Sequence, residues 1–377
     1  MGSQHFEIKP IAGRIGAKIV GLDLSDSLSD KIISDIRKAL VKYKVIFFRN
    51  QEKLDAKGQV AFARRFGEVT TAHPTVPSLP ENPEVLDLNY GKTVARANNW
   101  HTDVTFVDRP PLGSVLRALV IPSAGGDTIW SNSVTAYEDL PETLRHLADG
   151  LWAVHSNAYD YAAATVDLPQ EVRDYREVFT STVYETLHPV VRVHPESKER
   201  GLFIGGFVRR LRGLSTAESD DLIRLLQSYI TRPENTVRWR WKVGDVAFWD
   251  NRATQHYAIA DYGNQPRHVQ RVTIVGDIPV GINGNQSEAI KGDSSVYNRS
   301  LVLLYKILLE LAGNHVYESI ICRLNDGQVI VDPKPYRFSN RRNSICGVRT
   351  VIVRSRECLP SKHQSKSVKA PERPVIF

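Results

Sequence analysis

The stretch TVRWRWKVGDVAFWDNRATQHYAIADYGNQPRHVQRVTIVGD, residues 236–277, decides the fold class. It contains three runs with the composition of strands: TVRWRW (236–241), DVAFWD (245–250) and HVQRVTIVGD (268–277). Aromatic and β-branched residues favour such extended backbone, and the Gly, Asn and Pro residues between the runs end it. No helical pattern separates these strands, which argues against the regular βαβ alternation of a doubly wound sheet.

Outward from this stretch the chain stays mostly β. Residues 6–22 have the pattern of two short strands around a Gly turn, and VIFFR (45–49) that of a buried strand. Apolar residues at helical spacing predict helices over 28–43, 54–66, 132–149 and 215–230. The order of elements therefore predicts a mostly β fold, a double-stranded β-helix (jelly roll) with inserted and flanking helices.

The composition is that of a folded protein. The chain has 377 residues, of which 42% are hydrophobic and 24% charged, and this excludes a disordered or collagen-like chain. No apolar run reaches the roughly 18 residues of a membrane span. The N-terminal stretch MGSQHFEIKP has no apolar signal core. We therefore expect a cytoplasmic protein with no membrane partner.

The charge balance changes near residue 282. Residues 282–377 contain 15 Lys and Arg against 8 Asp and Glu, whereas the first 281 residues carry 34 of each kind. All three cysteines also lie in this last quarter, which excludes a disulfide framework before it. We therefore expect a main domain over residues 1–281 and a basic C-terminal extension over residues 282–377, partly disordered.

Two interpretations of this extension stay open. Its basic charge suits an appended module that contacts nucleic acid or an anionic surface. It also fits an extension without selected structure, because it carries no motif that we can name and its cysteine spacing does not suit zinc. We favour the second and expect no nucleic-acid partner. Within the extension we expect a helix over 300–313 and strands over 328–332 and 347–355.

The triplet His101-Thr102-Asp103 is the first candidate for chemistry. Residues i and i+2 of a strand point the same way, so this imidazole and carboxylate can share a metal ion. A second histidine would complete a face that suits Fe(II), with open positions for a cosubstrate and O2. Alone the pattern is weak, because 11 His and 42 acidic residues predict about one chance pair and the chain has three. We expect the other two histidines, His5 and His194, at the surface.

A second cluster strengthens the case. His256 follows the strand DVAFWD and a short loop, Arg267 comes eleven residues later, and Arg271 four residues after that. Arg271 lies within the apolar alternation of a strand, where a buried guanidinium requires an anionic partner. Two interpretations stay open: an internal salt bridge, and bidentate capture of an acidic ligand.

Three segments carry a resemblance to a known family: NWHTDVTF (99–106), GGDTIW (125–130), and WDNRATQHYAIADY with the two arginines after it (249–271). They resemble the Fe(II)/2-oxoglutarate-dependent dioxygenases of the taurine dioxygenase family, over about residues 6–281. The segment GGFVRRLRGLS (205–215) resembles the alkylsulfatase branch more closely than the taurine branch.

The resemblance implies a role for each matching residue. It implies that Fe(II) binds the three metal ligands and that the C5 carboxylate of 2-oxoglutarate lies against a threonine and an arginine. The metal ligands would be His101, Asp103 and His256, the 2-oxoglutarate residues Thr128 and Arg267, and the substrate residues His73, Arg271, Val104, Phe106 and Phe207. His73 and Arg271 would grip the sulfo group, His73 adding charge if protonated. The other three fit core packing equally well.

The implied activity is hydroxylation of the carbon that bears a sulfate ester or sulfonate, with succinate and CO2 as co-products. The hydroxylated product loses sulfate or sulfite and leaves an aldehyde, a reaction of sulfur metabolism. Val76, where the taurine branch has a tyrosine, argues against a taurine-type amine pocket. Two alternatives stay open: an aryloxyalkanoate or other carboxylate-substrate dioxygenase, and a catalytically silent jelly roll that binds a metabolite. We expect a small-molecule substrate and a homo-oligomer, dimer or tetramer.

Overall fold

The computed structural model describes residues 6–76, 78, 81–89, 97–158 and 177–298, and the backbone alone of 320–325, 328–333 and 352–353. The chain divides into two compact units, Met1–Tyr305 and Lys306–Phe377.

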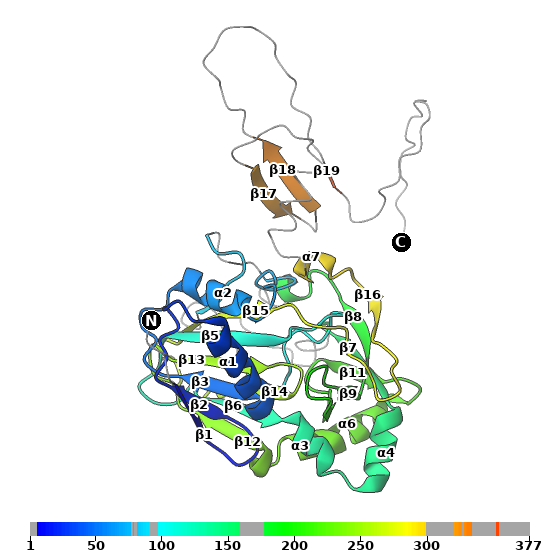
Figure 1. Cartoon of the computed structure of the whole chain (residues 1–377). Coiled ribbons are helices and arrows are strands. Elements are labelled where there is room, and N and C mark those ends of the chain that lie inside the picture. Colours follow the sequence, from blue (N-terminus) through cyan, green and yellow to red (C-terminus); the bar gives the residue numbers. More distant parts are fainter. Residues whose placement is uncertain are drawn as a thin grey trace, which may run out of the picture. The chain divides into compact units, whose positions relative to one another are not determined.

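The first unit contains a seven-stranded sheet with the order β1-β2-β3-β13-β5-β15-β4 (Figure 1). Its neighbouring strands are antiparallel except β2 and β3, which are parallel. The strands are β1 (Glu7–Pro10), β2 (Ala17–Val20), β3 (Val45–Phe48), β4 (Leu86–Asn89), β5 (Gly113–Val120), β13 (Val246–Asp250) and β15 (His268–Ile274). A second sheet has the order β12-β6-β14. Its strands are β6 (Thr128–Asn132), β12 (Thr236–Trp239) and β14 (Thr254–Ala258).

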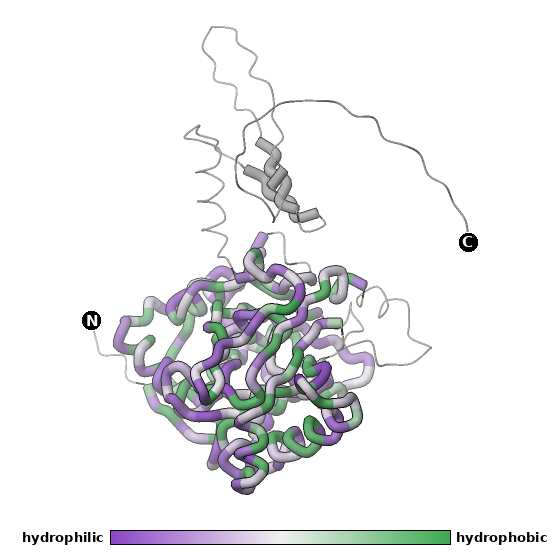
Figure 2. The backbone as a smooth tube through the Cα atoms, turned by 90° about the vertical axis from the view of Figure 1, so that its right-hand side faces the viewer, coloured by the Kyte–Doolittle hydropathy of each residue, from purple (hydrophilic) through white to green (hydrophobic). Residues whose placement is uncertain are grey.

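Both faces of the seven-stranded sheet are buried, which explains why its central strands are apolar without alternation. On one face, Phe47 of β3 packs against the second sheet, where its ring stacks on Trp239 at 4.1 Å between centroids. On the other face, Ile46 and Phe48 pack against helices α1 (Asp30–Tyr43) and α2 (Ala56–Arg64). Figure 2 shows the hydrophobic segments that run through this unit. These are the two packed layers and flanking helices expected of the jelly roll.

The four helices predicted before residue 282 are present, and one of them is divided. The expected helix over 132–149 forms α3 (Ser133–Glu138) and α4 (Glu142–Gly150), because Pro141 has no N–H to continue a helix. The helix expected over 215–230 is α6 (Thr216–Ile230), which Ser215 and Glu218 cap reciprocally. A 3-10 turn, η1 (Pro233–Asn235), precedes β12.

Smaller sheets complete the first unit. One has the order β11-β7-β8-β16 and another pairs β10 with β9. Their strands are β7 (Trp152–Ser156), β8 (Glu185–Pro189), β9 (Val191–Val193), β10 (Arg200–Leu202), β11 (Val208–Leu211) and β16 (Glu288–Lys291). The last helix among the described residues of this unit is α7 (Ser295–Asn298). Because β16 and α7 both follow Gly281, the boundary expected there lies inside the first compact unit, and the domain assignment of residues 1–281 stays a proposal.

The second unit contains an antiparallel sheet of β17 (Ile320–Asn325), β18 (Gln328–Pro333) and β19 (Ile352–Val353). The expected strand over 328–332 is thus present, whereas the expected helix over 300–313 lies outside the described residues. Among the described helices, none has both the length and the apolar character needed to cross a bilayer.

Candidate active site

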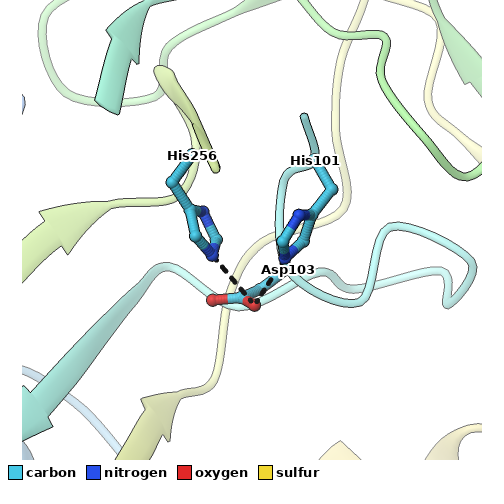
Figure 3. Close-up of side chains that lie close together, drawn as sticks. All are labelled: His101, Asp103 and His256. Carbon is cyan, nitrogen blue, oxygen red and sulfur yellow. Dashed lines mark ion pairs between the residues drawn. The ribbon is translucent and has the colours of Figure 1, made fainter. Parts of the chain in front are cut away.

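Two histidines and one aspartate, far apart in the sequence, converge in the first unit (Figure 3). The Nε2 atoms of His101 and His256 lie 4.0 Å and 3.8 Å from Oδ1 of Asp103. One ligand atom from each residue lies within 4.8 Å of the other two. The structure thus brings together all three residues of the predicted metal face.

The backbone itself joins the two histidines. His101 and His256 form an isolated antiparallel bridge, in which each N–H donates to the carbonyl of the other, at 3.1 Å and 2.8 Å. On β14, His256 lies opposite Trp130 of β6, whose side chain belongs to the core between the two sheets. The imidazole of His256 is therefore fixed on the inner side of the jelly roll.

Asp103 is held by residues that the sequence analysis did not identify. Ser114 Oγ donates to its Oδ2 at 2.7 Å. The side-chain oxygen of Asn251 accepts from the backbone N–H of Asp103 at 2.9 Å. The side-chain NH2 of Asn251 donates to the backbone carbonyl of Asp103 at 3.0 Å. Such outer partners orient a metal-binding carboxylate. Asn251 lies in the segment WDNRATQHY, whose resemblance to the family could have identified it as a site residue. No sequence feature identifies Ser114.

The electrostatics favour metal binding. Burial alone would raise the pKa of Asp103, but Arg271 and the two imidazoles outweigh it and lower this pKa to about 2. Burial, with His101 close by, lowers the pKa of His256 to about 3. An ionised carboxylate and a neutral imidazole are the forms that coordinate a metal. Nδ1 of His101 lies 2.6 Å from the carbonyl of Asn99, which leaves Nε2 to face Asp103. The donor set fits Fe(II).

Arg271 lies on β15 and points toward the same centre. Its side chain is 10% exposed and forms an ion pair with Oδ1 of Asp103. Its Nε is buried and has no hydrogen-bond partner among the described residues. Both interpretations of Arg271 therefore have support, because the salt bridge uses one donor of the guanidinium and leaves another for an anion.

His73 is neutral in this structure. Its Nδ1 accepts from the backbone N–H groups of Thr75 and Val76, at 3.2 Å and 3.1 Å. Burial and the nearby Arg271 lower the pKa of His73 to about 3. The imidazole therefore offers a donor at Nε2 and no charge near neutral pH, which does not support the expectation that a protonated His73 adds charge.

An apolar cluster lies beside the metal ligands. It contains the three predicted lining residues, Val104, Phe106 and Phe207, and Val76, which the sequence analysis also discussed. The members that were not predicted are Val107, Phe179, Tyr184 and Tyr297. The Phe207 ring lies 6.0 Å from that of His101, and the Phe106 ring 6.1 Å from that of His73. We call these residues the aromatic chamber. Val104 has φ 53°, a left-handed conformation that β-branched residues rarely adopt.

The proposed 2-oxoglutarate residues lie around the loop that precedes β6. Arg267 Nε donates to the carbonyl of Gly126 at 3.2 Å, and Arg267 and Thr128 are both buried. The indole N–H of Trp241 donates to Oγ1 of Thr128 at 3.0 Å. Because that oxygen accepts from the indole, the hydroxyl hydrogen of Thr128 is the part that can bind a carboxylate.

His194 is buried, and its expected surface position is wrong. Its Nε2 lies 3.0 Å from Oδ2 of Asp250, while its Nδ1 accepts from the N–H groups of Glu196 and Ser197. The turn after His194 forms as expected, but it folds the ring onto the end of β13. Arg252 also donates to both carboxylate oxygens of Asp250. This network holds the loop that contains Asn251.

Asp250→Asn is expected to lower the free energy of unfolding by about 3 kcal/mol at pH 7, because it breaks a buried ion pair. Burial would raise the pKa of Asp250, but Arg252 and His194 lower it well below its usual value. This stabilisation is complete above about pH 4 and is lost as the pH falls. Urea unfolding between pH 7 and pH 3 should show that the difference in free energy of unfolding between the wild type and Asp250→Asn becomes smaller at low pH. Asp221→Asn, an exposed control, should show no such trend; a constant difference for Asp250→Asn would contradict the assignment.

Comparisons with known proteins identify the family of this chain. Residues 7–273 match the family described as "Taurine catabolism dioxygenase TauD, TfdA family". An alpha-ketoglutarate-dependent sulfate ester dioxygenase of Pseudomonas putida is 55% identical over 288 residues, 76% of this chain and 95% of the relative. An alkylsulfatase of Acinetobacter baylyi is 49% identical over 75% of this chain and 89% of the relative. A 2,4-dichlorophenoxyacetate dioxygenase of Cupriavidus pinatubonensis is only 31% identical over 72% of this chain and 98% of the relative.

Solved structures of the same family are similar to this fold. The crystal structure of a putative alpha-ketoglutarate-dependent taurine dioxygenase from Burkholderia xenovorans has a TM-score of 0.67 and 41% identity, covering 77% of this chain and 99% of that one. The predicted jelly-roll fold and the cofactors Fe(II), 2-oxoglutarate (alpha-ketoglutarate) and O2 are confirmed. The chain belongs to the TauD, TfdA family and is an Fe(II)- and 2-oxoglutarate-dependent dioxygenase.

Proposed function

We propose that this enzyme hydroxylates the carbon that bears a sulfate ester, or a sulfonate, and so releases sulfate or sulfite. The observation that carries the proposal is the buried Arg271, which pairs with the candidate metal ligand Asp103 and whose Nε has no hydrogen-bond partner among the described residues. A tetrahedral oxyanion suits a forked, permanently charged donor. Two of the similar proteins are named as a sulfate ester dioxygenase and an alkylsulfatase, at 55% and 49% identity.

Different residues of the site would bind the iron and the 2-oxoglutarate. His101, Asp103 and His256 would hold the iron, which with 2-oxoglutarate and O2 supplies the oxidising power and yields succinate and CO2. Arg267 and Thr128 would bind the far carboxylate of 2-oxoglutarate. Binding at two fixed sites orients the target C–H bond toward the metal and keeps other bonds away.

The substrate would lie between the anion site and the aromatic chamber. Arg271 would donate to the sulfo oxygens as a cation, and His73 as a neutral N–H donor. The chamber would take the hydrocarbon part and exclude water. Replacing C–H by C–OH beside the ester oxygen gives a hemiacetal-like product. It loses hydrogen sulfate, and the carbon becomes an aldehyde.

A carboxylate substrate is the second candidate, because a guanidinium also binds carboxylates bidentately. The aryloxyalkanoate relative is much less similar to this chain, which favours the sulfate ester. A panel of alkyl sulfates, alkyl sulfonates and aryloxy acids separates these candidates. Succinate formed together with sulfate supports the proposal, and succinate formed only with phenol release would overturn it.

Arg267→Ala is expected to raise the KM for 2-oxoglutarate about 100-fold, because charge-assisted hydrogen bonds to a carboxylate are lost. The KM for the sulfate ester should stay nearly unchanged. Initial rates of succinate release, with each substrate varied in turn, check this split. An unchanged KM for 2-oxoglutarate would remove Arg267 from the site, and the exposed Arg224→Ala serves as the control.

We also propose a cytoplasmic location, where 2-oxoglutarate is available, and a homo-oligomeric state, dimer or tetramer. Both rest on the sequence-based expectations.

A further inference from the structure

A short segment beyond the family match packs into the core of the first unit. The family match ends at residue 273, yet β16 after it pairs with β8, with Glu288 opposite Leu187. The helix α7 then places Tyr297 in the interior, where its side chain is 2% exposed. The Tyr297 carbonyl accepts from the N–H of Thr71 at 3.2 Å. This segment therefore packs into the first unit as part of its core.

The Tyr297 hydroxyl begins a chain of hydroxyl groups. It lies 3.4 Å from Oγ1 of Thr273, which in turn contacts Oγ1 of Thr70. Thr70 Oγ1 donates to the carbonyl of Thr71 at 2.7 Å. Each hydroxyl has one hydrogen, so when Thr70 donates to a carbonyl, Thr273 donates to Thr70 and Tyr297 to Thr273. Burial raises the pKa of Tyr297, which keeps this donor protonated at neutral pH.

This hydroxyl chain joins the two segments that bear the anion-binding residues. Thr273 lies two residues after Arg271 on β15, so both side chains are on the same face of the sheet. Thr70 lies three residues before His73, and its N–H donates to the carbonyl of Thr273 at 3.0 Å. The ring of Tyr297 meanwhile belongs to the aromatic chamber.

We propose that Tyr297 is a positioning residue for the substrate anion: by bracing β15 against the segment before His73, it sets the spacing of Arg271 and His73. This inference rests on the proposed function. Small errors in such spacing weaken binding strongly, since oriented groups lose their advantage with displacements of about 1 Å. Among the described residues, Tyr297 makes no hydrogen bond to the three candidate metal ligands, so we expect its loss to affect ester binding more than iron or 2-oxoglutarate binding.

Tyr297→Phe tests the proposal, because it removes the hydroxyl and keeps the ring. The KM for the sulfate ester should rise about five- to tenfold, as for a lost hydrogen bond, while the KM for 2-oxoglutarate and iron uptake stay the same. The matched control is Tyr137→Phe, a buried tyrosine that donates to Asp149 at 2.9 Å away from this site. It should leave both KM values unchanged.

Truncations add a second measurement. A chain that ends at Tyr305 should keep the wild-type KM for the ester, whereas one that ends at Gly281 loses ester turnover. An unchanged ester KM in Tyr297→Phe, or a parallel rise of both KM values, would overturn the inference even if the shorter chain fails to fold. If the wild-type enzyme releases sulfate from no ester, the proposed function fails, and this inference with it.

Discussion

Asp103→Ala will abolish iron-dependent succinate formation. The carboxylate lies between both imidazoles, 4.0 Å and 3.8 Å from their Nε2 atoms, and provides the one negative charge of the donor set. Loss of partners outside the ligands alone weakens metal binding about 10- to 100-fold, so loss of a ligand should exceed 100-fold. Iron bound per chain after anaerobic loading and succinate released per minute measure the two effects.

Asp103→Asn separates charge from packing in the same experiment. The amide keeps the size of the side chain and a partner for Ser114, but it removes the charge that faces Arg271. It should lose iron as Asp103→Ala does. Asp221→Asn, on the exposed face of α6, should behave as the wild type. Full iron uptake or retained turnover by Asp103→Asn would refute the ligand assignment.

Arg271→Ala is expected to lower kcat/KM for the sulfate ester about 100-fold or more. Two hydrogen bonds to a charged group are worth about 3 kcal/mol or more together, and about 1.4 kcal/mol corresponds to tenfold. The KM for 2-oxoglutarate should change little, opposite to the pattern expected for Arg267→Ala. Initial rates with both substrates varied measure the two effects separately.

Arg271→Lys sharpens this prediction. Lysine keeps the charge but loses the planar fork, so ester turnover should recover only in part. Because Arg271 also pairs with Asp103, iron uptake must be measured in both variants. If the variants take up less iron but keep the wild-type KM for the ester, Arg271 acts only on the metal ligand Asp103. That result would contradict its role in anion binding.

Local patterns carried much of the prediction. The apolar run VIFF and the run VAFWD predicted buried strands, which are β3 and β13. The triplet at residues 101–103 and His256 predicted the metal face, although Asp103 lies in a turn after the His101 bridge and not on the strand that the prediction assumed. These inferences needed only neighbours in the sequence, or a motif whose chemistry limits its residue types.

Long-range packing decided what the patterns left open. The sequence pattern could not show that His194 folds onto Asp250, since the turn after it is the same whether the ring is exposed or buried. Nor could it show that His73 is neutral, because its pKa depends on burial and on a guanidinium from another strand.

The sequence by itself determined which chemical groups are present and, through its strand and helix patterns, the fold class; its resemblance to a known family indicated the candidate metal ligands. Only the tertiary structure decided which of these groups meet: Asn251 with Asp103, Arg271 with the same carboxylate, and Tyr297 with Thr273. The physical reason is that strand and helix periodicity act over a few residues. Desolvation, ion pairing and close packing depend on distances that only the folded chain fixes.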